Sequence, residues 1–169
     1  ALFLGGSNNT IQGIGIRRYA SGLTSLGTIY MINGGHTVRD VVIEDSASTA
    51  LNLGQVGRGG PLHVTETSIV RAGMVGIAGN GIDDGLIERS HIVDANWAGF
   101  NAAPNSAGMK ILRTQDVTVR DNVVEGTASS GIWFDESVAG FRATGNRVTG
   151  GTSWGIMAEL SGDGVIADN

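Results

Sequence analysis

The stretch "VRDNVV" at residues 119–124 sets the pattern for the whole chain. Six related segments, each with an apolar first residue, begin at Ile11, Val38, Val64, Ile87, Ala143 and Ile166. Taken in chain order together with residue 119, the starting positions are 27, 26, 23, 32, 24 and 23 residues apart. A period of this length predicts a repeat architecture in which each unit packs only against its neighbours.

Two columns of apolar residues follow from this alignment. The sixth position of the unit holds only isoleucine or valine: Ile16, Ile43, Ile69, Ile92, Val124 and Val148. A second column lies eight residues further on: Leu51, Ile77, Phe100, Ile132 and Ile156. Only the first unit breaks the offset, with extra residues around "GLTSLG" at 22–27. Short β-branched segments between glycine, asparagine, aspartate and serine turns predict strands of a solenoid.

The fourth position of the unit forms a polar column. Its members are Thr67, Ser90, Asn122, Asn146 and Asn169. Small polar side chains at a turn bend the chain and hydrogen-bond to their counterparts in the coils above and below. We therefore predict an all-β fold, a right-handed parallel β-helix of six to seven coils of 23–27 residues. Residues 1–169 are expected to form one such domain.

The coils, with their "V-x-x-N-x-V" and following "G-I" pattern, resemble the right-handed parallel β-helix repeat proteins. That superfamily contains pectate lyases, polygalacturonases and alginate epimerases, so the resemblance implies a carbohydrate-active protein. It covers nearly the whole chain and is specific for the fold. It is less specific for activity, because this scaffold carries many activities.

The composition and net charge limit the classes of partner that this protein is expected to bind. The net charge of -5 and the pI near 5.0 argue against nucleic acid, which needs a basic surface. There is no cysteine, and we predict neither a metal site nor a cofactor. No apolar run approaches the roughly 20 residues of a membrane span. A secreted or cell-surface location fits a polysaccharide or oligosaccharide partner.

The chain opens on Ala1 rather than on an initiator methionine. This start predicts a piece of a longer protein, without caps on the solenoid. Uncapped coils leave backbone donors and acceptors open, so end-to-end self-association is expected.

Two consecutive coils place a carboxylate at the same position, in "GIWFDES" at 131–137 and in "GIMAELS" at 155–161. Side chains alternate along a strand, so Asp135 and Glu159 are predicted to point outward from strands about 4.8 Å apart. Carboxylates about 5–5.5 Å apart suit a retaining glycosidase, one as nucleophile and the other as acid/base. The alternative is a pair of solvated surface acids.

The long 32-residue interval allows two placements of the next strand. Either Phe100 begins it, or Met109 does, with "WAGFNAAPN" at 97–105 looped out. We favour the second placement, because it separates Gly108 from Gly131 by 23 residues, the usual period.

This placement puts Lys110 beside Trp133 and Met157 on the outside of the coils. Lys110 then flanks the two acids and becomes a third candidate catalytic residue. Trp133 and Met157 become candidate substrate-binding residues. The looped-out Trp97 is expected at the rim of the same groove, where sugar rings stack on aromatic faces.

The segment "GIWFD", followed by a coil that ends in glutamate, is similar to the β-helix glycosidases of the β-xylosidase type. This resemblance covers about thirty residues. It implies that Asp135 is the nucleophile and Glu159 the proton donor of a retaining glycoside hydrolase.

Two other functions remain open. A polysaccharide lyase or epimerase would use Lys110 and Arg113 beside a uronate, although the usual sequence motifs of those enzymes are missing. A non-catalytic glycan-binding or structural solenoid needs only the repeat itself.

Overall fold

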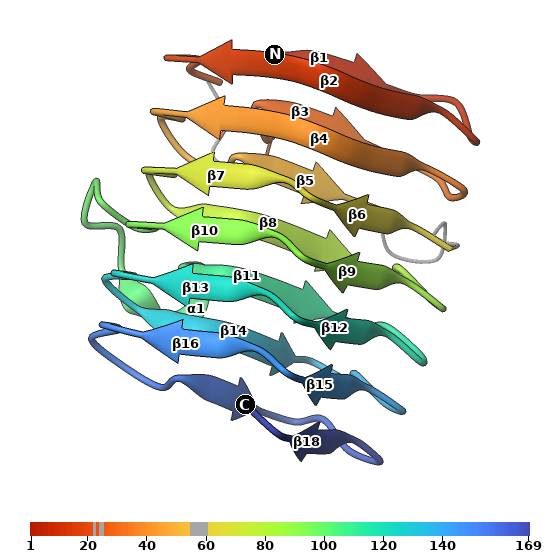
Figure 1. Ribbon diagram of the computed structural model, residues 1–169, viewed down its shortest axis with the longest axis vertical. Helices are drawn as coiled ribbons and strands as arrows, with labels where there is room; N and C mark the ends of the chain where they lie inside the picture. The colour runs from red at the N-terminus through yellow and green to blue at the C-terminus, as the bar shows by residue number, and fades with distance from the viewer. Residues whose placement is uncertain (22, 24–25, 55–60) are drawn as a thin grey trace.

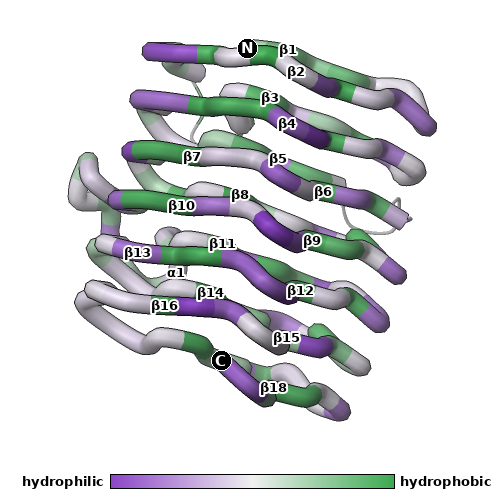
Figure 2. Tube along the Cα trace, viewed as in Figure 1, coloured by the Kyte–Doolittle hydropathy of each residue, from purple (hydrophilic) through white to green (hydrophobic). Residues whose placement is uncertain are grey.

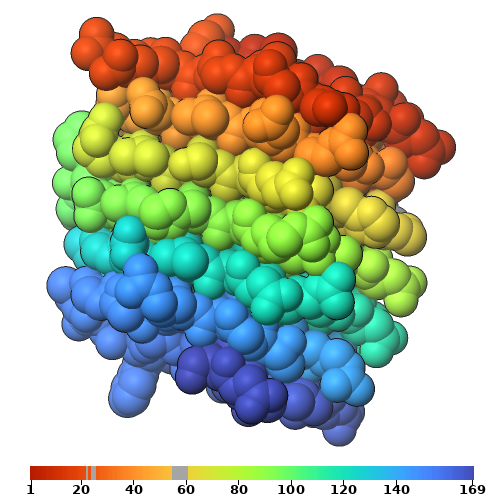
Figure 3. All heavy atoms as spheres, in the orientation of Figure 1, coloured from red at the N-terminus to blue at the C-terminus, as the bar shows by residue number. Residues whose placement is uncertain are grey.

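The structure is a computed structural model that describes residues 1–21, 23, 26–54 and 61–169. The chain winds into stacked coils, with the N-terminus in the first coil and the C-terminus in the last (Figure 1). In the space-filling view, successive coils form successive bands from one end of the molecule to the other (Figure 3). All strand pairs are parallel, and the predicted all-β right-handed parallel β-helix is confirmed.

One sheet contains seven strands in the described residues, one strand from each coil. In order across the sheet these are β1 (Leu2–Leu4), β3 (Ile29–Met31), β5 (Leu51–Leu53), β8 (Val75–Asn80), β11 (Ala107–Leu112), β14 (Ser130–Asp135) and β17 (Ile156–Ala158). This sheet lies behind the other in Figure 1 and carries Lys110, Trp133 and Met157 on its outer face.

The second sheet contains eleven of the described strands. They are β2 (Thr10–Arg17), β4 (Thr37–Glu44), β6 (His63–Thr65), β7 (Ser68–Val70), β9 (Leu86–Glu88), β10 (His91–Val93), β12 (Thr118–Arg120), β13 (Val123–Glu125), β15 (Arg142–Thr144), β16 (Arg147–Thr149) and β18 (Val165–Ala167). From β6 to β16, each coil contributes two short strands on either side of a corner, and the last coil contributes β18.

The two apolar columns form the core between the sheets. Ile69, Ile92 and Val124 are fully buried and stand opposite one another in the register of β7, β10 and β13. The second column continues in the other sheet, where Ile77 stands opposite Met109. Along the coils, apolar and polar residues alternate in short segments (Figure 2), because one side of each strand faces the interior.

The structure decides between the two placements of the long interval. Met109 lies in β11 and pairs with Ile77 on one side and Ile132 on the other, whereas Phe100 lies outside any strand. The favoured placement is therefore confirmed. The looped-out residues include the single turn α1 (Ala102–Asn105), and the green loop that leads to it projects from the side of the stack in Figure 1.

The corner of the second sheet requires a left-handed backbone at the third position of every unit. The residues with positive φ there are Gly13, Asp40, Glu66, Arg89, Asp121, Gly145 and Asp168. This conformation costs a non-glycine residue roughly 1–2 kcal/mol, so other interactions must hold each corner in place.

From the unit that begins at Val64 onward, polar side chains at the fourth position supply those interactions. The N–H of Ser90 donates to Oδ1 of Asn122 at 3.0 Å, and the N–H of Asn122 donates to Oδ1 of Asn146 at 3.1 Å. The N–H of Asn146 donates in turn to Oδ1 of Asn169 at 2.9 Å. The amide group of Asn122 also donates to the carbonyl of Ile87 at 3.0 Å. This asparagine ladder confirms that the polar column joins neighbouring coils.

We predict that Asn122→Ala lowers the free energy of unfolding by about 1–3 kcal/mol, because the buried N–H of Ser90 loses its acceptor. Denaturant unfolding followed by circular dichroism measures the change. The matched control is Asn101→Ala, since Asn101 is exposed and its side chain caps no helix. Equal stability of the two variants would show that the ladder does not hold the corner.

Candidate functional site

All the predicted site residues except Trp97 lie on the outer face of the seven-stranded sheet or directly after its strands. In the register of β11, β14 and β17, Lys110 stands opposite Trp133, and Trp133 stands opposite Met157. Glu159 follows β17, and its N–H donates to the carbonyl of Phe134 at 2.8 Å, which continues the ladder by one residue. Asp135 and Glu159 therefore lie at the ends of neighbouring strands.

Lys110 is held from three sides. Its Nζ lies 3.1 Å from Oδ2 of Asp135, and the two side chains are only 8% and 9% exposed. The same Nζ lies 3.4 Å from the centroid of the Trp133 ring and donates to the carbonyl of Pro104 in α1. A cation over an aromatic face and beside a carboxylate is stabilised twice. Lys110 thus ties the α1 turn to the sheet beneath it.

The burial of Trp133 and Asp135 differs from the solvent-facing position that the sequence led us to expect. Both side chains do point away from the core, yet both residues are buried. The reason is the looped-out segment, because its α1 turn lies across the outer face of β11 and β14 and contributes Pro104 to the contacts of Lys110.

The two carboxylates line different cavities. Asp135 lines a cavity of about 340 Å³, together with Asn80, Lys110, Arg113 and Pro104. Glu159 lines a smaller cavity of about 210 Å³. The other residues that line the smaller cavity are Ala102, Ala103, Ser129, Ser130, Trp133, Ser153, Trp154 and Met157. The α1 turn contributes to both cavities and lies between them, so the single groove expected from the sequence is divided.

Trp97 does not join either cavity. It is 54% exposed and lines a separate cleft with Arg18, Tyr19 and Asp45 at a corner of the second sheet. The expectation that Trp97 borders the groove of Asp135 is therefore wrong. The first part of the looped-out segment, with Trp97, lies at this corner, whereas its last part, α1, contacts Lys110 of β11.

Two residues at these cavities were missed as site residues by the sequence. Trp154 is 64% exposed and lines the cavity of Glu159. Asn80 lines the cavity of Asp135, and its buried Oδ1 has no hydrogen-bond partner. Asn80 pairs with Leu112 of the next coil, and this repeat position was the sequence signal that could have located it.

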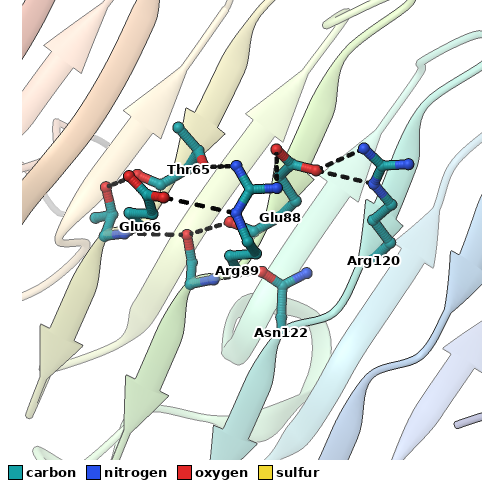
Figure 4. A network of polar contacts seen from close by, with 8 residues as sticks. Thr65, Glu66, Glu88, Arg89, Arg120 and Asn122 are labelled. Carbon is teal, nitrogen blue, oxygen red and sulfur yellow. Dashed lines mark hydrogen bonds and ion pairs between the residues drawn. The ribbon is translucent and has the colours of Figure 1, made fainter.

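A cluster of charges lies on the outer face of the other sheet (Figure 4). Nη1 of Arg89 lies 2.6 Å from Oε1 of Glu88, and Nη2 of Arg120 lies 2.7 Å from Oε2 of Glu88. Burial acts to raise the pKa of Glu88, but the hydrogen bond from Arg120 and the charges of both arginines outweigh it and lower the pKa. Both carboxylate oxygens are paired, so we interpret the cluster as a link between coils.

The chain matches the model of a known protein family. The model of the family described as "Right handed beta helix region" matches residues 3–169. The chain therefore belongs to the right-handed β-helix family. Comparisons with curated proteins and with solved structures gave no match. Membership in this family defines the fold class, whereas the activity depends on the residues of the site.

The described residues add two findings on cofactors and membranes. Within residues 1–21, 23, 26–54 and 61–169, no three histidine, aspartate or glutamate side chains are grouped so that they suit a metal ion. In the same part of the chain, no helix has the length and apolar character needed to cross a bilayer.

We predict that Lys110→Met lowers the free energy of unfolding by about 3–5 kcal/mol, because it leaves Asp135 as an unpaired buried charge. Adding Asp135→Asn should recover part of this loss, since the buried charge is then removed. Denaturant unfolding of the two single variants and the double variant gives the coupling energy. Strictly additive losses would contradict a working ion pair.

Acid should weaken the Glu88 cluster. Because the folded-state pKa of Glu88 is lowered, its stabilising contribution is present above the ordinary pKa of 4.5 and is lost as the pH falls through the folded value. We expect Glu88→Gln to melt earlier than the wild type at neutral pH, and the difference to shrink on acidification. Thermal melts from pH 7 to pH 3 measure this, with exposed Asp163→Asn as the control. A difference that stays constant with pH would refute the interpretation.

Proposed function

We propose that this β-helix protein is a retaining glycoside hydrolase that acts on a polysaccharide or oligosaccharide, with Asp135 as nucleophile and Glu159 as acid/base. The observation that carries the proposal is the register of β14 and β17, which puts the two acids at the ends of neighbouring strands. Adjacent strands lie about 4.8 Å apart. That spacing is close to the roughly 5–5.5 Å between the carboxyl groups of retaining enzymes.

The surroundings of the two acids differ in a way that supports these roles. Nζ of Lys110 stabilises negative charge on Asp135, and a nucleophilic carboxylate must be ionised to attack the anomeric carbon. Glu159 is exposed, and no ion pair in the described part of the chain holds its carboxylate. It is therefore free to exchange a proton with the leaving oxygen and then with water.

The cavity of Glu159 also suits a sugar. Trp133, Trp154 and Met157 line it. Aromatic rings offer flat apolar faces, and the nearby Ser130 and Ser153 offer hydroxyl groups to a polar ring. Because the α1 turn lies between the two cavities, a substrate that reaches both acids requires this turn to move aside.

A polysaccharide lyase is the second candidate, on the observation that Lys110 and Arg113 line the same cavity as Asp135. In such a reaction a base removes the proton next to the uronate carboxylate, and the glycosidic oxygen leaves as a double bond forms. The product absorbs ultraviolet light, whereas the product of hydrolysis does not. A secreted or cell-surface location belongs to the same proposal, because it would bring the protein to extracellular polysaccharides.

A screen of neutral and uronate-containing polysaccharides with the purified chain tests the proposal. We expect release of reducing sugar with retention of the anomeric configuration. Proton nuclear magnetic resonance of the first product measures this configuration. Glu159→Gln should lower the rate by about 10²–10⁴-fold, the usual contribution of general acid–base catalysis. Asp163→Asn, an exposed acid elsewhere, should keep the wild-type rate.

Asp135→Asn should abolish turnover, but this variant needs a stability control. Contrary to the expectation from the sequence, Asp135 is a buried partner of Lys110, so its replacement also weakens the fold. Activity is therefore compared at a temperature where melting curves show the variant folded. Wild-type turnover by both amide variants would overturn the assignment. An ultraviolet-absorbing product would support the lyase, and binding without turnover a binding solenoid.

A further inference from the structure

A third cleft lies at a corner of the second sheet, apart from both carboxylate cavities. Its volume is about 400 Å³, and none of its lining residues lines the cavity of Asp135 or that of Glu159. It is lined by Arg18, Tyr19, Ala20, Asp45, Ala47, Trp97 and Ala98. These residues follow the ends of β2, β4 and β10, so three coils that are distant in sequence build one cleft.

Backbone contacts bring the aromatic residues of this cleft together. The N–H of Ala47 donates to the carbonyl of Tyr19 at 3.0 Å, which joins the first coil to the second. The N–H of Ala98 donates to the carbonyl of Gly73 at 3.3 Å, so the looped-out segment leans back toward the preceding coil. Trp97 is thereby turned toward the first coils instead of toward β14.

The two aromatic side chains are exposed although they stand in a cleft. Tyr19 is 46% exposed and Trp97 is 54% exposed. Two exposed aromatic side chains that line one cleft offer a ligand apolar area, and covering this area releases water. Tyrosine and tryptophan present a flat face that a ring-shaped ligand can cover, with a polar edge that can hydrogen-bond.

Charged groups stand beside these rings. Nε of Arg71 donates to Oδ1 of Asp45 at 2.6 Å, and this hydrogen bond lowers the pKa of Asp45, so the carboxylate stays ionised. Arg18 is held only loosely, with its Nε 3.9 Å from Oδ2 of Asp45 and its side chain 75% exposed. Within the described residues no other ion pair holds Arg18, so guanidinium donors are available for the oxygens of a ligand.

We propose that this cleft is a second glycan-binding site, in which a pyranose ring covers Trp97 or Tyr19 and its oxygens accept hydrogen bonds from Arg18. The ligand class rests on the proposed function, while the site itself lies away from the reacting acids. Such a site would hold a polysaccharide along the coils and raise its local concentration near the cavities of the other sheet.

Titration calorimetry on the Glu159→Gln variant, which should not consume the ligand, tests the site. The probes are neutral xylo-oligosaccharides and, in parallel, oligogalacturonides, which show whether Arg18 binds hydroxyl or carboxylate oxygens. We expect Trp97→Ala and Tyr19→Ala each to weaken binding by tenfold or more. Trp97→Phe keeps an aromatic face and should keep most of the affinity.

The matched control is Phe3→Ala, which removes an exposed aromatic side chain that lines neither carboxylate cavity nor the cleft and should leave binding unchanged. Unchanged affinity in Trp97→Ala, with turnover by the wild type intact, would overturn the second site and spare the hydrolase. Binding that depends on Trp97, in a protein without turnover, would support the site and overturn the hydrolase. No binding of either probe would overturn the site.

Discussion

The hydrogen bond from the corner of one coil to an asparagine side chain of the next is the interaction on which the rest of the structure depends. Each coil must turn through a residue with positive φ, such as Arg89 or Asp121, and such a residue is strained. The N–H that follows is buried and needs an acceptor. Asn122 and Asn146 supply it from the neighbouring coil, so the turn and the stacking of coils stabilise each other.

Once the corner is held, the register of every strand follows. A slip by one residue would move the buried isoleucines to the surface, so the outward positions are fixed as strictly as the core. Function can then be built on the outside without disturbing the inside. Lys110, Trp133 and Met157 occupy successive outward positions, and the 32-residue interval adds its extra residues between strands rather than within them.

The fixed outward register also means that an ion pair of the candidate site is buried. Lys110 and Asp135 are outward residues, yet the α1 turn covers them and removes them from water. A buried ion pair is expensive to break, and this one also holds the turn that separates Asp135 from Glu159. In the proposed function, the interaction that keeps the nucleophile ionised therefore also limits the access of the substrate. Lys110 therefore affects both the stability of the fold and the proposed activity.

The sequence by itself determined the repeat, the fold class and the outward row of Lys110, Trp133 and Met157, because a period of 23–27 residues and the alternation along strands are local regularities. The path of the looped-out segment has no such regularity. Only the tertiary structure decided that this segment buries Trp133 and Asp135 and sends Trp97 to another corner. Its course depends on contacts with residues in other coils, such as the hydrogen bond from Lys110 to Pro104, and no spacing in the chain encodes these contacts.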